Sequence, residues 1–198
     1  SATSFNLAAS LGEIGKKVAK RLQGFDMNIL AYDPFIKEVP DYVTMVTLEE
    51  LMKKSMFVTL HTRLCNETER MIDEEKLGMM RPDAYLINTA RSGLVDEKAL
   101  YETLKAKKIA GAAIDVFDIE PPAKDYPIVT LENVTITPHL AGGTVDAFTG
   151  SPKLLAKEMF YITEGKLSRY IVNHSIFQNV AKKLNKKADC IDGLWIKK

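Results

Sequence analysis

The sequence predicts an α/β protein built on a doubly wound parallel sheet with helices on both faces. Short apolar runs rich in branched or small residues alternate along the chain with amphipathic segments of helical period. Parallel strands need such helical crossovers between them. A chain of 198 residues buries about 70% of its unfolded surface, so we expect a substantial core.

Six strands are predicted, in chain order. They are residues 5–9 (FNLAA), 28–32 (NILAY), 56–60 (MFVTL), 85–89 (YLINT), 111–117 (GAAIDVF) and 134–137 (VTIT).

The first predicted helix covers residues 13–25 (EIGKKVAKRLQGF). Its apolar residues Ile14, Val18, Leu22 and Phe25 recur at spacings of four and three, while its basic residues occupy the opposite side. We therefore expect these four side chains to face the core.

Two further helices are predicted in residues 47–55 and 96–108. Thr47 and Asp96 are suitable N-caps, and Glu50, three residues after Thr47, would complete a capping box.

A last helix is expected in residues 143–166. Pro152 is tolerated only in a first turn, so the TGSP stretch at 149–152 should start or kink this helix.

Composition excludes several classes of partner. The 27 basic and 26 acidic side chains nearly cancel, so we expect no binding to nucleic acid or to anionic lipid. The basic run KKLNKK at 182–187 is interpreted as a solvated helix face. No apolar run approaches the roughly 18 residues that cross a bilayer. Cys65 and Cys190 fit no metal-ligand spacing, so we expect no metal site and two reduced thiols in a cytoplasmic protein.

The stretch SLGEIG at residues 10–15 resembles a glycine loop that binds phosphate. It follows a predicted strand and opens a helix, where backbone N–H groups and the helix dipole favour a pyrophosphate. Gly12 permits close approach of the phosphate and Gly15 permits close helix packing, whereas Ser10 stands where the tight turn of a Rossmann-type loop prefers glycine. A glycine-permitted packing contact is the alternative interpretation.

Asp33 ends the second predicted strand, 18 residues after Gly15. A carboxylate there can accept hydrogen bonds from an adenosine ribose and would repel a 2′-phosphate, which favours NAD over NADP. Asp33-Pro34 is also a common turn opener, so a solvated turn residue remains the alternative.

Three other strands end in chemically active side chains: Arg91, Glu120 and His139. The carboxyl ends of parallel strands face one crevice, so we expect these three to meet there. Each alone could be an ordinary surface or loop residue. Together, a guanidinium can bind a substrate carboxylate, an imidazolium can protonate the adjacent carbonyl as hydride arrives, and an acid can orient that imidazole. This set predicts interconversion of 2-hydroxy and 2-keto acids.

Further residues of the same rim are candidates for cofactor binding. The full expected cofactor set is Ser10, Gly12, Glu13, Ile14, Asp33, His61, Thr62, Thr89, Ala90, Asp115 and Gly142.

Four segments resemble the NAD-dependent D-2-hydroxyacid dehydrogenases, the group that includes D-3-phosphoglycerate dehydrogenase. They are LHTRLCNETERMID, YLINTARSGLVDEKAL, IAGAAIDVFDIEPP and NVTITPHLAGGT. The resemblance implies that Arg91 binds the substrate carboxylate, that His139 is the acid/base and that Glu120 pairs with it. It also implies Asp33 on the adenosine ribose, Asp115 on the nicotinamide carboxamide and a homodimer interface along residues 143–165.

The sequence departs from this family in three places. Ser10 replaces a glycine, Arg63 replaces a proline on the adenine side, and the first strand has smaller residues than usual. Members also carry a second, substrate-binding domain. We expect a dinucleotide-binding domain at 1–172, with 173–198 as a remnant of the substrate domain and its N-terminal part absent. A non-enzymatic NAD-binding or dimerisation module is therefore the alternative to an oxidoreductase.

Overall fold

The computed structural model of the chain describes residues 5–8, 11–36 and 38–163. The chain forms two compact units, residues 1–141 and 142–198. The predicted boundary after residue 172 and the tail beyond it lie outside the described residues, so the domain division stays a prediction.

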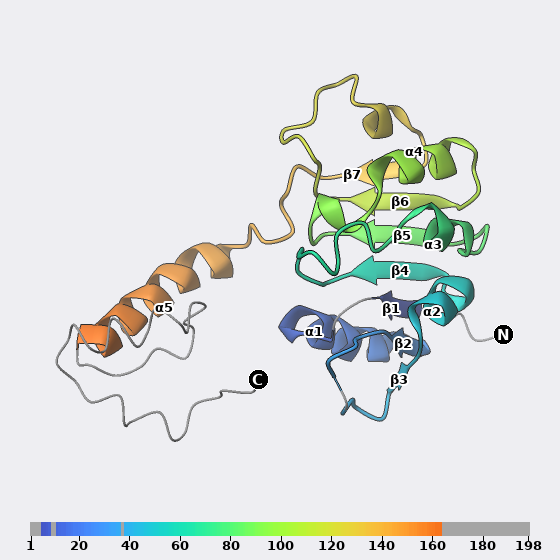
Figure 1. Cartoon of the computed structure of the whole chain (residues 1–198). Coiled ribbons are helices and arrows are strands. Elements are labelled where there is room, and N and C mark those ends of the chain that lie inside the picture. Colours follow the sequence, from blue (N-terminus) through green and yellow to red (C-terminus); the bar gives the residue numbers. More distant parts are fainter. Residues whose placement is uncertain (1–4, 9–10, 37, 164–198) are drawn as a thin grey trace. The chain divides into compact units, whose positions relative to one another are not determined.

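The first unit contains a parallel sheet, which confirms the predicted fold class. Its strands are β1 (Phe5–Ala8), β2 (Ile29–Ala31), β3 (Val43–Met45), β4 (Phe57–Leu60), β5 (Tyr85–Asn88), β6 (Gly111–Ile114) and β7 (Val134–Ile136). Five strands pair in the order β1-β4-β5-β6-β7, and β2 pairs with β3. Strand β2 lies beside β1, which gives the continuous stack seen in Figure 1.

The strand order reverses direction at β1. The chain runs outward from β1 through β2 to β3, and then crosses to β4 on the other side of β1. This is a doubly wound topology, whose switch point between β1 and β4 is where such sheets bind ligands, beyond the carboxyl ends of the strands.

Strand β3 was not among the predicted strands, and β6 is shorter than predicted. β3 has only three residues, one of them exposed, so it shows little apolar pattern. Strand β6 ends at Ile114, the last residue paired with β7, rather than at Phe117. Residues 115–117 therefore belong to the loop that carries the site.

The helices are α1 (Glu13–Leu22), α2 (Leu48–Lys54), α3 (Glu74–Gly78), α4 (Glu97–Lys105) and α5 (Val145–Thr163), with 3-10 turns η1 (Gln23–Phe25), η2 (Ser92–Leu94) and η3 (Pro127–Thr130). Both predicted N-caps are confirmed. The Thr47 hydroxyl accepts from the Glu50 N–H at 3.1 Å, and the Asp96 carboxylate accepts from the Ala99 N–H at 3.0 Å. The Glu50 carboxylate pairs with Lys54.

The apolar core explains why one face of the sheet is covered by helices. Alternate residues of neighbouring strands share a face, and the register aligns Val58, Leu86 and Ala112. All three are buried in one cluster with the apolar residues of α2, α3 and α4. A second cluster joins α1 to β2 and β3.

The predicted buried face of α1 is partly wrong. Ile14 is exposed, and Phe25 is exposed in η1 rather than in the helix. The helix buries its small residues Gly15 and Ala19 instead. Small side chains let the helix axis approach the strands, as the third glycine of a dinucleotide loop does.

The last helix does not start at the TGSP stretch, which was one of the two predicted effects of Pro152; the other, a kink, stays a prediction. Helix α5 begins at Val145, upstream of the TGSP stretch, and Pro152 lies inside it. The Thr144 hydroxyl accepts from the Ala147 N–H at 3.1 Å, so the helix has its N-cap there. Within the described part of the chain, no helix combines the length and apolarity needed to cross a membrane.

Candidate active site

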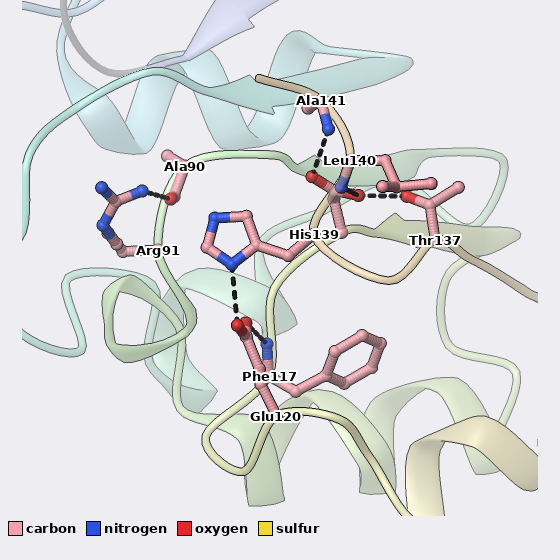
Figure 2. A network of polar contacts seen from close by, with 9 residues as sticks. Ala90, Arg91, Phe117, Glu120, Thr137, His139, Leu140 and Ala141 are labelled. Carbon is pink, nitrogen blue, oxygen red and sulfur yellow. Dashed lines mark hydrogen bonds and ion pairs between the residues drawn. The ribbon is translucent and has the colours of Figure 1, made fainter. Parts of the chain in front are cut away.

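Glu120 and His139 form a hydrogen-bonded pair at the carboxyl edge of the sheet. The Glu120 Oε2 atom lies 2.7 Å from the His139 Nδ1 atom, and Glu120 Oε1 accepts from the Phe117 N–H at 3.0 Å (Figure 2). The hydrogen bonds from His139 and from the Phe117 backbone hold the pKa of the Glu120 carboxyl below its usual value. The acid is thereby kept ionised as the acceptor for an Nδ1–H group.

The buried carboxylate of Asp115 fixes the loop that carries His139. It accepts hydrogen bonds from the Thr137 hydroxyl and from the backbone N–H groups of Leu140 and Ala141, the last two at 2.8 Å (Figure 2). Burial alone would raise the pKa of Asp115, but these donors and the nearby His139 lower it. The loop is therefore attached to the end of β6 on both sides of the histidine.

His139 itself has a left-handed backbone conformation, with φ of 55°. A non-glycine residue in this region costs about 1 kcal/mol or more and persists only where its surroundings impose it. The Asp115 contacts on either side supply that constraint.

Asn88, at the end of β5, shapes the turn that presents Arg91. Its side-chain amide donates to the Arg91 carbonyl at 2.9 Å, and its oxygen accepts from the Ala90 N–H at 3.1 Å. The exposed Arg91 guanidinium donates to the Ala90 carbonyl at 2.6 Å (Figure 2). One of its five N–H groups is used in this contact.

The structure thus brings the three predicted catalytic residues to neighbouring strand ends. β5, β6 and β7 are adjacent in the sheet, and Arg91, Glu120 and His139 follow them in that order. The His139 Nε2 atom, the ring nitrogen opposite Glu120, points to the side where Arg91 is drawn (Figure 2).

Asp33 occupies the corresponding position at the end of β2. Its buried carboxylate accepts from the Leu11 N–H at 2.8 Å and from the Phe35 N–H at 2.9 Å. Asp33 therefore ties the glycine loop to the β2 end, which the sequence did not reveal. A carboxylate has about four acceptor positions, and the described residues occupy two of them.

The glycine loop leads directly into α1. Gly12 is the N-cap and brings no side chain of its own over the first turn, and Glu13 and Ile14 are exposed there. Ser10 lies outside the described residues. This arrangement fits a pyrophosphate at the helix N-terminus.

A shallow hollow lies beside Asp33 at the ends of β2 and β3. Its lining includes the acids Asp33, Glu49 and Glu50, together with Tyr32 and Met45. An acidic hollow disfavours an additional phosphate.

His61 and Thr62 follow β4 at the switch point. The His61 Nε2 atom lies 3.2 Å from the Thr59 hydroxyl, and burial lowers the pKa of the His61 imidazole. Thr62 is half-buried, whereas Thr89 in the Asn88 turn is exposed. Gly142 belongs to the second unit, so its relation to these residues is not described.

Two contributors to the site were missed by sequence reasoning: Thr137 and the Phe117 N–H group. The second is a backbone group, which leaves no residue-type signal. Thr137 stands 22 residues from Asp115, so no local pattern joins them.

Comparisons with known proteins agree with the fold. Residues 8–141 match the family profile described as D-isomer specific 2-hydroxyacid dehydrogenase, NAD binding domain. The D-3-phosphoglycerate dehydrogenase of Methanocaldococcus jannaschii is 43% identical over 167 residues, which are 82% of this chain and 32% of that protein.

Two solved structures are also similar. The D-isomer specific 2-hydroxyacid dehydrogenase of Lactobacillus delbrueckii ssp. bulgaricus, in its NAD-complexed form, has a TM-score of 0.77 and 31% identity over 86% of this chain and 56% of that one. An acyclic imino acid reductase in complex with NADPH and D-Arg has a TM-score of 0.78 and 33% identity over 83% of this chain and 52% of that one. The chain thus spans about a third to a half of these proteins.

The lowered pKa of His61 predicts a pH dependence of stability. The unfolded chain protonates this imidazole near pH ~6.5, whereas the folded protein does so only at lower pH, so the free energy of unfolding should fall as the pH drops below ~6.5. Urea unfolding at several pH values should show this decline, and His61→Gln should weaken it. An equal slope in wild type and variant would contradict the assignment.

Proposed function

We propose a catalytic role on the premise that the chain belongs to the D-isomer specific 2-hydroxyacid dehydrogenases, whose NAD-binding domain it matches. In this proposal the chain is the cofactor domain of an oxidoreductase that interconverts D-2-hydroxy acids and 2-keto acids. The 2.7 Å contact between Glu120 and His139 carries the proposal, because an imidazole held by a carboxylate is the arrangement of a general acid/base.

The residues at the β1 and β2 ends fit a dinucleotide. The first turn of α1 would hold the pyrophosphate through the N–H groups of residues 12–14, and Asp33 would accept hydrogen bonds from the adenosine ribose. His61, Thr62, Thr89, Ala90, Asp115 and Gly142 are proposed to line the cofactor, together with Ser10. When bound, NADH supplies the hydride that adds to the substrate carbonyl carbon, and NAD⁺ is the product.

His139 would supply the proton that balances this transfer. Its Nδ1–H group faces the Glu120 carboxylate, which leaves Nε2 for the substrate. Protonated Nε2 gives its proton to the carbonyl oxygen of the keto acid, and neutral Nε2 accepts it in the reverse direction. Glu120 stabilises the imidazolium form in both directions.

Arg91 would bind the substrate carboxylate. A guanidinium presents a planar pair of N–H donors that matches a carboxylate in bidentate fashion. The exposed position of Arg91 after β5 leaves this group accessible. The hydrogen bond from the Asn88 amide to the Arg91 carbonyl fixes the backbone from which the side chain extends. The 2-keto acid would therefore be held by its carboxylate, with its carbonyl toward His139.

We also propose that the protein is a homodimer through α5. This helix exposes several large apolar side chains, namely Val145, Phe148, Leu154, Leu155 and Met159, and a soluble surface rarely carries such a group of residues without a partner. Sedimentation equilibrium should give twice the monomer mass for wild type. Leu155→Lys should shift the mass toward the monomer, whereas Lys153→Gln on the same helix should not; a monomeric wild type would refute the dimer.

The cytoplasmic location expected from the cysteines stays a prediction. Cys65 is not in a disulfide, and Cys190 lies outside the described residues.

Replacement of Asp33 should change cofactor selectivity. Wild type should bind NADH more tightly than NADPH, because the carboxylate repels the 2′-phosphate. Asp33→Asn keeps an oxygen acceptor for the Leu11 N–H but removes the charge. The ratio of the Kd for NADPH to the Kd for NADH should therefore fall by about tenfold, or ~1.4 kcal/mol. Titrations followed by cofactor fluorescence measure both constants.

Asp26→Asn, beyond the opposite end of α1, is the charge-matched control for that titration. If Asp33→Asn prefers NADH over NADPH as strongly as wild type does, Asp33 does not contact the ribose. Absence of NADH binding to wild type even at millimolar concentration would refute the cofactor site.

Replacement of His139 should abolish turnover without loss of the cofactor. With a panel of short 2-keto acids, His139→Gln should lower the rate of NADH oxidation by about 10² to 10⁴ while the Kd for NADH stays within about twofold of wild type. Lys124→Gln, exposed in the same loop as Glu120, is the control. Wild type that binds NADH but oxidises none with any keto acid would favour a non-enzymatic NAD-binding module.

A further inference from the structure

We propose that Tyr126 and Glu97 are a positioning pair that holds Glu120 in line with His139. The inference deepens the proposed function and rests on it, because it assigns the groups that orient the acid/base. Neither residue is at the strand ends that carry Arg91, Glu120 and His139.

A hydrogen bond joins the two residues across separate elements. The Tyr126 hydroxyl, just before η3, donates to Glu97 Oε1 in the first turn of α4 at 2.6 Å. Burial and the Glu97 carboxylate raise the pKa of Tyr126 far above neutral pH. The hydroxyl is therefore always protonated and available as the donor.

The Tyr126 ring in turn packs on Phe117. The two rings meet edge to face, with centroids 6.0 Å apart and planes at 88°. Edge-to-face contact is a favourable arrangement for two aromatic rings. Phe117 is buried, so its position is set by Tyr126 and by the surrounding core.

Phe117 transmits this position to Glu120 through its backbone. Its N–H group donates to Glu120 Oε1 at 3.0 Å, while Oε2 of the same carboxylate contacts His139 (Figure 2). Residues 118–121 are exposed, so packing of the loop itself cannot orient Glu120. Its orientation depends on the Phe117 N–H group at the start of the loop, and Tyr126 at the other end anchors that group to α4.

Glu97 also borders the turn that presents Arg91. It lines a small cavity of about 10 Å³ together with Asn88, whose amide donates to the Arg91 carbonyl, and Ser92, which follows Arg91. One carboxylate therefore adjoins both the carboxylate-binding turn and, through Tyr126, the acid/base loop.

The tautomer of His139 tests the proposal without any need for turnover. The spectra are recorded at about pH 9, and in a neutral imidazole a hydrogen bond to Glu120 requires the proton on Nδ1. Nitrogen chemical shifts of the ring, assigned by comparison with His139→Gln, should show Nδ1 protonated and Nε2 unprotonated in wild type. Glu120→Ala, which removes the acceptor, should remove this preference.

Four variants separate a positioning role from a structural one. Tyr126→Phe keeps the ring but loses the hydroxyl, and Glu97→Ala loses the acceptor. Both substitutions should remove most of the shift difference between the two ring nitrogens of His139. Glu97→Gln keeps a carbonyl acceptor and should retain the wild-type shifts. Tyr101→Phe, a tyrosine of α4 whose ring lies 5.3 Å from Lys105 Nζ, should also leave them unchanged.

The outcomes distinguish this inference from its premise. Wild-type shifts in Tyr126→Phe, with the shifts of Glu120→Ala altered, would overturn the positioning pair alone. Wild-type shifts that show no Nδ1 preference would overturn the Glu120–His139 pair and with it the proposed acid/base. Loss of the shift difference between the two nitrogens in both Glu97→Ala and Glu97→Gln would mean that the charge of Glu97, rather than its hydrogen bond, is what matters. That result would also overturn the proposal.

Discussion

The buried carboxylate of Asp115 is the interaction on which the site depends. It stands at the end of β6 and receives three hydrogen bonds from residues 137–141, which follow β7. An ionised acid in this position is stable only while these donors surround it. The loop is therefore held in the one conformation that satisfies the carboxylate, and that conformation places His139 beside Glu120 with a left-handed backbone.

The two halves of the sheet use the same device. Asp33 lies just after β2 and accepts a hydrogen bond from the Leu11 N–H of the glycine loop. In the same way, Asp115 lies just after β6 and accepts hydrogen bonds from the loop that carries His139. In each case a buried acid at a strand end fixes the backbone that follows another strand. Parallel strands make this possible, because all their carboxyl ends open on one edge.

Orientation in this site comes from backbone donors as much as from side chains. Glu120 is exposed, yet the Phe117 N–H group and the His139 ring each bind one of its oxygens. Arg91 is exposed as well, and its turn is clamped by the Asn88 amide. Chemically active side chains can therefore face an open crevice while the atoms that aim them belong to the buried sheet.

The sequence by itself determined the parallel sheet, most strands, two N-caps and the three residues Arg91, Glu120 and His139, because apolar period and residue type record these features locally. Tertiary structure decided the rest. It added β3, whose three residues carry too little pattern to be predicted. It left Ile14 exposed, because α1 approaches the strands through Gly15 and Ala19. It also kept Pro152 inside α5. It also supplied the Thr137 and Tyr126 contacts, 22 and 29 residues from their partners; such pairs exist only after the strands align, so no local spacing predicts them.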